Sequence, residues 1–276
     1  MFHVIMAGGS GTRFWPWSTD KKPKQLLNIY QEKTMIRDTV NRIKEIDGPD
    51  KIFIIAKYNL IKKIKEEIPE IPHKNFILEP SAKNTAPAIG LCAMHLLKID
   101  ENEVMAIYPS DHYIGGKEFR DTIKRAKKFA SKNFGLITIG VKPTYPATGY
   151  GYININKKID DELNIYGVNR FIEKPDRRTA ESLLSKSGNY WNSGIFVWSM
   201  KSIISSIKKH MPELHQSLLN IYSHIDKASY SEKLNLYWDN IISESIDYGI
   251  LEKEKYIYLV IGEFIWSDLG SWQSLY

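Results

Sequence analysis

Apolar and polar residues follow two different patterns along the first half of the chain. Five short runs are almost entirely apolar, which is typical of buried strands: residues 3–7, 51–56, 75–78, 103–108 and 136–141. Between them, four stretches carry apolar residues at helical spacing: residues 34–46, 59–68, 88–98 and 117–131. Strands that alternate with helices predict a mostly parallel sheet.

The pattern changes after residue 141. Segment 143–153 is rich in turn residues, and 176–248 is mainly helical. Three further runs predict strands: residues 170–175, 194–200 and 256–261. No Ser- or Gly-rich linker and no internal repeat divides the chain. We therefore expect one domain over residues 1–276, with a Rossmann-like, doubly wound α/β fold and a mixed, mostly parallel sheet.

Composition and charge narrow the classes of protein further. The chain of 276 residues is long enough to bury a full core, and its net charge is +6. Its lysines are mostly interleaved with acidic residues, as in 61–68, so we expect no nucleic-acid partner. No run approaches the roughly 18 apolar residues of a membrane helix, and the first residues do not resemble a signal peptide. We expect a cytoplasmic protein without a membrane partner.

The densest candidate site is the glycine-rich segment MAGGSGTRFWPWSTDKKPKQ, residues 6–25. It directly follows an apolar run, so its glycine amides can form a nest for an anion. A dinucleotide-binding motif is excluded because Phe14 stands where the third glycine would be, and the Walker motif is absent. Arg13 can contact phosphate oxygens with its planar guanidinium. The alternative interpretation is a tight turn with a surface arginine.

Two carboxylates follow predicted strands. Asp111, in YPSDH, lies just after the run at 103–108, where open α/β sheets place their ligands. Asp268, in WSDLGSW, follows the run at 256–261. Carboxylate oxygens suit a hard cation such as Mg²⁺, so the two residues are candidate metal ligands. The alternative for Asp111 is a turn or helix-capping residue.

Three segments combine aromatic faces, small residues and polar tips, the mixture that carbohydrate sites need. They are TGYGY at 148–152, EKP at 173–175 and YWNSG at 190–194. Each is equally compatible with a β-turn or a bulge.

Taken in order, these segments resemble the sugar-1-phosphate nucleotidyltransferases, and within them the branch that uses mannose and guanine. The resemblance covers almost the whole chain and rests on nine motifs: AGGSGTRFWPWS (7–18), KPKQ (22–25), EPSAKNTAPAI (79–89), PSDH (109–112), TGYGYI (148–153), FIEKP (171–175), WNSGIF (191–196), SIDYGILE (245–252) and WSDLGSW (266–272). The family has a glycosyltransferase-A-like fold, consistent with the alternating pattern.

The resemblance implies that GTP and α-D-mannose 1-phosphate react to give GDP-mannose and pyrophosphate. The attacking phosphate is already ionised near neutral pH, so no general base is required. The implied catalytic residues are Arg13, Lys24, Asp111 and Asp268, the two aspartates also binding Mg²⁺. The implied nucleotide-binding residues are Gly8, Gly9, Gly11, Pro80, Asn84, Thr85 and Ser110. The implied sugar-phosphate-binding residues are Gly151, Glu173, Lys174 and Asn192.

The family resemblance also predicts how the chain is organised. Residues 1–141 would mainly bind the nucleotide and residues 142–276 mainly the sugar phosphate. Family members usually continue into a C-terminal β-helical segment, which we expect to be absent here, and a homodimer is compatible with the resemblance. Two alternatives stay open: transfer of another nucleotide, such as from UTP or dTTP to glucose 1-phosphate, and a non-catalytic sugar-nucleotide sensor.

Overall fold

The computed structural model describes residues 1–9, 14–30 and 32–270. Its strands are β1 (Phe2–Met6), β2 (Ile52–Lys57), β3 (Phe76–Glu79), β4 (Val104–Pro109), β5 (Tyr113–Gly115), β6 (Leu136–Val141), β7 (Tyr152–Asp160), β8 (Ile165–Ile172), β9 (Asn189–Ser199), β10 (Ile257–Gly262) and β11 (Ile265–Ser267). Its α-helices are α1 (Met35–Asp47), α2 (Tyr58–Glu67), α3 (Thr85–Leu97), α4 (Glu118–Ala130), α5 (Arg177–Leu184), α6 (Met200–His210), α7 (Pro212–Tyr222) and α8 (Tyr230–Asp239), and a short π-helix, η5, spans Asp247–Leu251.

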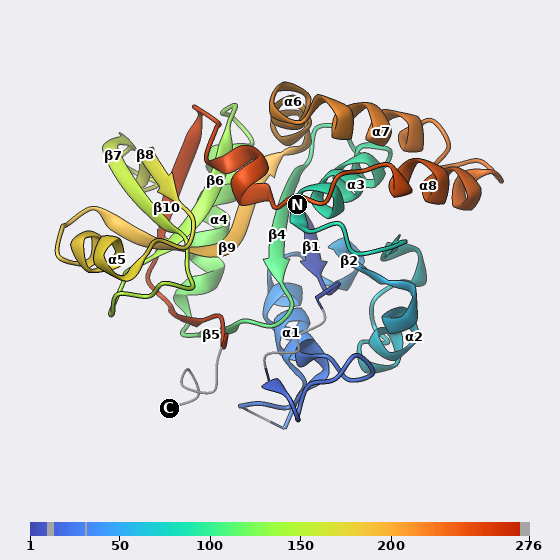
Figure 1. The fold of residues 1–276 in the computed structure, drawn as a ribbon, viewed down its shortest axis with the longest axis horizontal. Coiled ribbons are helices and arrows are strands. Elements are labelled where there is room, and N and C mark those ends of the chain that lie inside the picture. The colour runs from blue at the N-terminus through green and yellow to red at the C-terminus, as the bar shows by residue number, and fades with distance from the viewer. Residues whose placement is uncertain (10–13, 31, 271–276) are drawn as a thin grey trace.

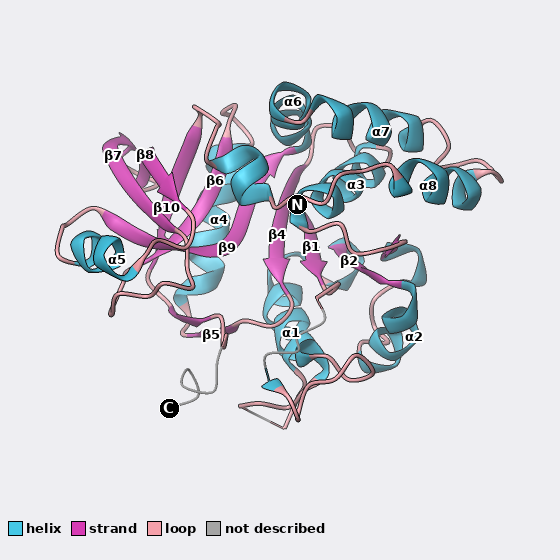
Figure 2. Ribbon diagram, viewed as in Figure 1, coloured by secondary structure: helices cyan, strands magenta, loops and turns pink. Residues whose placement is uncertain are grey.

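One nine-stranded sheet runs through both halves of the chain, in the order β3-β2-β1-β4-β9-β6-β10-β8-β7 (Figure 2). The pairings β3–β2, β2–β1, β1–β4 and β6–β10 are parallel. Strands β8 and β9 run opposite to the other strands of this sheet, which makes it mixed but mostly of one direction. The predicted fold class is therefore confirmed.

Helices cover both faces of the sheet (Figure 1). Residues of α1, α2 and α4 belong to one buried apolar cluster, and residues of α3, α6, α7 and α8 belong to a second. Both clusters include strand residues, because the side chains of a strand alternate between its two faces. The neighbours Val4 and Ile5 of β1, both fully buried, point into different clusters. Nearly unbroken apolar runs are thus the expected sequence of these strands.

Helix boundaries follow from capping residues. The Thr34 side chain accepts a hydrogen bond from the Arg37 N–H at the start of α1, and Gly48, at φ +78°, ends the helix. Asp176 caps α5 and Ser199 caps α6 in the same way. Among the described residues, no helix has both the length and the apolar composition needed to cross a membrane.

Two predicted boundaries were wrong. Strand β8 ends at Ile172, so Glu173 and Lys174 lie in the loop after it, and Lys174 has a positive φ of 44°. Strand β9 starts at Asn189 rather than at residue 194, because its first residues pair with β7 as well as with β6. The division of the two halves by role stays a prediction.

The buried position of Ile5 leads to a stability prediction. Replacing Ile5 with Ala leaves a cavity in the centre of the sheet, so the free energy of unfolding should fall by about 2–5 kcal/mol. Urea denaturation measures this change. Ile242→Ala is the control, because Ile242 is 68% exposed and its loss should change stability by no more than about 0.5 kcal/mol. Equal losses in the two variants would contradict the predicted core.

Candidate active site

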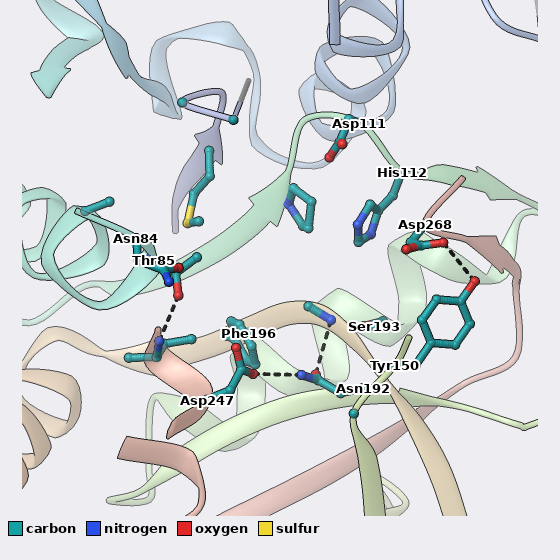
Figure 3. Close-up of a pocket in the computed structure, with 18 of the residues that line it drawn as sticks. Asn84, Thr85, Asp111, His112, Tyr150, Asn192, Ser193, Phe196, Asp247 and Asp268 are labelled. Atoms are coloured by element: carbon teal, nitrogen blue, oxygen red, sulfur yellow. Dashed lines mark hydrogen bonds between the residues drawn. The ribbon is translucent and has the colours of Figure 1, made fainter. Parts of the chain in front are cut away.

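A cavity of about 480 Å³ opens at the carboxyl ends of β1, β3 and β4 (Figure 3). Open α/β sheets bind their ligands at this edge, because the loops that follow parallel strands meet there. The opposite wall comes from the second half of the chain, from the loop before β7, the loop after β8, the middle of β9, and η5. The cavity therefore lies between the two halves, and both supply polar groups to it.

The glycine loop after β1 forms one wall. A Cβ atom at Gly8 would lie 2.6 Å from Oε2 of Glu79, so any larger residue here would require the Glu79 carboxylate to move. The side-chain amide of Gln25, which is buried, donates to the carbonyl oxygens of Ala7 at 2.9 Å and Gly9 at 3.2 Å. These bonds explain why a glutamine is useful shortly after the glycines. Gly11 and Arg13 lie outside the described residues.

The segment after β3 continues this wall. Glu79 is only 5% exposed and accepts a hydrogen bond from the Lys83 N–H at 3.3 Å. Burial raises the pKa of the Glu79 carboxyl, although the Lys83 amide and the charge of Lys57 oppose the change. Asn84 caps α3 by accepting from the Thr85 N–H. The Thr85 hydroxyl in turn accepts from the Ile246 N–H at 2.7 Å, so this segment contacts the residue before η5.

Lys24 joins two distant parts of the chain beside the cavity. Its Nζ donates to Oδ2 of Asp111 at 3.0 Å and to the main-chain oxygen of Asp268 at 2.5 Å. The antiparallel pair β5–β11 positions these groups, since Tyr113 and Ser267, close to the two aspartates, are register partners. Burial raises the pKa of the Asp111 carboxyl, but the charges of Lys24 and His112 outweigh it and lower the pKa below its usual value.

Asp268 is oriented by further contacts. Its Oδ1 accepts from the Tyr150 hydroxyl and from the Gly270 N–H, both at 2.8 Å. Burial, the hydrogen bond with Tyr145 and the charge of Asp268 all raise the pKa of Tyr150, so this phenol stays a neutral donor. Trp266 donates to Nδ1 of His112 at 3.2 Å, which leaves Nε2 of that imidazole to carry the proton when it is neutral.

The far end of the cavity is lined by polar groups from the second half of the chain. A Cβ atom at Gly151 would lie 2.5 Å from Oε2 of Glu173 and 3.3 Å from the Cβ of Asn192. Lys174 donates to Oε1 of Glu173. Burial lowers the pKa of the Lys174 ammonium, but this hydrogen bond and the Glu173 charge raise it overall. Asn192 donates from Nδ2 to Oδ1 of Asp247 at 3.0 Å.

Most of the predicted site residues meet in this one cavity. Ten line it: Gly8, Gly9, Asn84, Thr85, Asp111, Gly151, Glu173, Lys174, Asn192 and Asp268. Lys24 contacts the two aspartates from the side, whereas Pro80 and the buried Ser110 are not among the lining residues. Ser110 instead donates its N–H to the Met6 carbonyl and so extends the pairing of β4 with β1. The functional roles of all these residues stay predictions.

Several residues around the cavity were missed in the sequence, and four of them make the polar contacts or close approaches described above. Glu79, Tyr150 and Asp247 line the cavity, and Gln25 supports the glycine loop. All four lie inside the motifs quoted above, so membership of a motif was an available signal. No periodic pattern distinguished them, because each depends on partners that are distant in the sequence.

This edge cavity in a doubly wound sheet defines a Rossmann-like α/β protein. A family model described as nucleotidyl transferase matches residues 2–276. A mannose-1-phosphate guanylyltransferase from Escherichia coli is 35% identical over 286 aligned residues, which cover 99% of this chain and 60% of that protein. The chain therefore belongs to the nucleotidyl transferase family, as its motifs predicted, and spans about three fifths of the length of this curated relative.

Two solved structures have a similar fold over nearly the whole chain. A mannose-1-phosphate geranyltransferase from Thermus thermophilus is similar with a TM-score of 0.89 and 28% identity, covering 99% of this chain and 77% of that one. A mannose-6-phosphate isomerase from Helicobacter pylori is similar with a TM-score of 0.78 and 27% identity, covering 96% of this chain and 99% of that one.

The close packing at Gly151 can be tested by adding one methyl group. Gly151→Ala should lower the free energy of unfolding by about 1–3 kcal/mol, because the new Cβ overlaps Glu173 and crowds the Phe171 ring and Asn192. Gly149→Ala is a matched control, since a Cβ there has no atom within 4 Å and the change should stay within about 0.5 kcal/mol. Chemical denaturation of both variants compares them, and similar stability would contradict the packing described.

Proposed function

We propose that this chain transfers GMP from GTP to α-D-mannose 1-phosphate, giving GDP-mannose and pyrophosphate. The observation that carries the proposal is the position of Lys24, Asp111 and Asp268. They lie between the cavity residues of the first half of the chain and those of the second half. An ammonium group and two carboxylates at this point suit a reaction between two phosphate-bearing molecules. The similarity to the Escherichia coli mannose-1-phosphate guanylyltransferase supports the choice of sugar and nucleotide.

In the proposed reaction, an oxygen of the sugar phosphate attacks the α-phosphorus of GTP in line. A bond forms between that oxygen and phosphorus, the bond to the β-phosphate breaks, and pyrophosphate leaves with the electron pair. The second ionisation of a phosphate monoester has a pKa of about 6, so no base is needed to generate the nucleophile. This chain would bind and orient the two substrates and neutralise the negative charge of their phosphates. Lys24 and Arg13 are proposed to meet the triphosphate, and Lys174 the sugar phosphate.

The two aspartates fit a magnesium ion. Within the described part of the chain, no group of three or more His, Cys, Asp or Glu residues could hold a metal ion. Mg²⁺ nevertheless commonly takes only one or two carboxylates and completes its shell with water and substrate phosphates. Asp111 and Asp268 would hold the ion, and both residues line the same cavity. When bound, Mg²⁺ supplies positive charge that offsets repulsion between the two substrates.

Glu79 supports guanine as the base. Its buried carboxylate lines the cavity beside Gly8 and can accept two hydrogen bonds when ionised. Guanine presents two adjacent donors on one edge, N1–H and the 2-amino group, whereas uracil and thymine present a single ring N–H. A base with two donors thus satisfies this group better, and leaving a buried acceptor unpaired is costly.

A substrate panel tests the proposed function directly. With Mg²⁺ present, pyrophosphate release should be fastest for GTP with mannose 1-phosphate. Asp111→Asn should lower this rate by about 100-fold or more, because it removes charge from the proposed metal ligand. Asp121→Asn, on the exposed side of α4, is the control and should keep full activity.

The same panel separates the alternatives. If UTP or dTTP with glucose 1-phosphate clearly reacted faster, the proposed substrates would be wrong. If the unmodified protein bound GTP but released no pyrophosphate with any sugar phosphate, the non-catalytic sensor would replace the proposed enzyme.

Inosine triphosphate tests the role of Glu79, since it lacks only the 2-amino group of GTP. The unmodified protein should use GTP about 10- to 100-fold better in kcat/KM, the worth of one hydrogen bond to a charged group. In Glu79→Gln this preference should shrink to a few-fold, because the amide replaces one acceptor by a donor. Glu66→Gln, an exposed residue of α2, should keep the full preference. An undiminished preference in Glu79→Gln would exclude Glu79 as the base-reading group.

A further inference from the structure

Asp247 occupies the far end of the cavity without an assigned role. It is the first residue of η5 and lines the cavity together with Glu173, Lys174 and Asn192. Figure 3 shows its carboxylate connected to the Asn192 side chain. The way that side chain is held determines what Asp247 can do.

The Asn192 amide has one possible orientation. Its Oδ1 accepts from the buried Thr138 hydroxyl at 3.1 Å and from the Gly194 N–H at 3.2 Å. With the oxygen held by two donors, Nδ2 must face Asp247, to which it donates at 3.0 Å. Asn192 therefore uses its amide group to hold Oδ1 of Asp247 in place. Its own contact with a ligand is limited to the second N–H.

The backbone around Asp247 is also held firmly. The preceding Ile246 donates its N–H to the Thr85 hydroxyl at 2.7 Å, and the Asp247 carbonyl accepts from the Glu252 N–H at 2.9 Å. Two residues later, a Cβ at Gly249 would lie 2.7 Å from the sulfur of Met211, so η5 packs tightly on its other side. Among the residues that the structure describes, the side chain of Asn192 and the backbone N–H of Asp247 itself are the donors to this carboxyl. A firmly held carboxylate thus lines the cavity and keeps the capacity to accept a further hydrogen bond.

The charges around Asp247 distinguish it from a structural carboxylate. Glu173 and Lys174 face it from the loop after β8, while Asn192 of β9 and Thr85 of α3 are uncharged. Burial and then the charge of Glu173 raise the pKa of Asp247 to about 7, and the charge of Lys174, the backbone N–H of Asp247 and the Asn192 hydrogen bond only partly oppose them. A permanent ion-pair partner would have lowered the pKa instead. The group is thus suited to a neutral hydrogen-bonding ligand rather than to a cation.

We propose that Asp247 accepts a hydrogen bond from a ring hydroxyl of the hexose and that Asn192 is its positioning residue. This inference rests on the proposed function, because the hexose 1-phosphate is the substrate that would occupy this end of the cavity. A buried polar group that pairs with one hydroxyl discriminates strongly against sugars that lack the hydroxyl. Asp247 then sets which hexose 1-phosphates are accepted, while the groups near Lys24 act on the phosphates.

Steady-state kinetics of Asp247→Asn and Asp247→Ala test the proposal. Asp247→Ala should raise KM for mannose 1-phosphate roughly 10- to 100-fold, the worth of one hydrogen bond to a charged group, and leave KM for GTP within about 2-fold. Asp247→Asn keeps the shape and the bond from Asn192, so it separates the contact from a folding defect. Asp161→Asn is the control, because that side chain is 95% exposed in the turn between β7 and β8.

Monodeoxy analogues of mannose 1-phosphate identify the contact. In the unmodified protein, one analogue should have a higher KM than mannose 1-phosphate, by about the factor by which Asp247→Ala raises the KM of mannose 1-phosphate. In Asp247→Ala, that analogue should react as well as the parent sugar. An unchanged KM for mannose 1-phosphate in both variants would overturn the proposal. The proposal would also be overturned if every deoxy analogue that has a raised KM in the unmodified protein had an equally raised KM, relative to mannose 1-phosphate, in Asp247→Ala. Failure of the proposed function looks different, since the unmodified protein itself would then release little or no pyrophosphate from GTP and mannose 1-phosphate, or would release it faster from another pair of substrates.

The dependence of KM on pH gives a readout that a purely structural carboxyl would not affect. A hydroxyl that donates to the Asp247 carboxylate favours the ionised group. With a pKa of about 7, the ionised fraction rises about 10-fold between pH 6 and pH 8, so KM for mannose 1-phosphate should fall by up to that factor. Ionisation of the substrate is common to all variants, so the ratio of KM between the unmodified protein and Asp247→Asn isolates this effect. A ratio that is constant over this range would overturn the proposal.

Discussion

The site depends on one buried ammonium group. Lys24 is only 5% exposed, and its Nζ bonds both the Asp111 carboxylate and the main-chain oxygen of Asp268. A charge that is withdrawn from water to this extent needs partners, and Asp111 supplies an opposite charge while the Asp268 carbonyl supplies a hydrogen-bond acceptor. The same bonds hold the segment after β4 against the segment after β11. One interaction therefore stabilises the fold and sets the distance between the two aspartates.

Glycines and side-chain amides around Lys24 position the other polar groups of the cavity. Gly8 and Gly151 let the backbone pass within contact distance of Glu79 and Glu173 respectively. Gln25 fixes the loop on one side of the cavity, and Asn192 fixes Asp247 on the other. Glu79 and Asp247 are thereby held by neutral donors rather than by a permanent cation, which leaves their charge available to a ligand. This arrangement is what supports the proposed transfer between two small polar substrates.

Much of the first half was predictable from sequence because its strands are continuous apolar runs that end in Gly, Pro or Asp. That rule located Gly8, Gly9 and Asp111, which follow β1 and β4 directly. It failed for β5 and β11, whose three residues each are too few to show a period. The rule also missed Asp247, because a single π-helical turn has no amphipathic pattern. The side chain of Asp247 is held by Asn192, which is 55 positions away in the sequence. Local patterns locate strand ends, but they do not record pairings between distant segments.

The pairing of β5 with β11 has a consequence for how the chain acquires its site. Lys24 and Asp268 are 244 positions apart, so their contact closes one of the longest loops available to this chain of 276 residues. Closing such a loop carries a large entropy cost, and contacts of this kind form late unless other contacts have already shortened the distance. A nascent chain can form β1 to β4 and their glycine loop long before β11 is synthesised. The two aspartates can therefore meet only after β11 has been synthesised, when the strands of the first half are already available to pack.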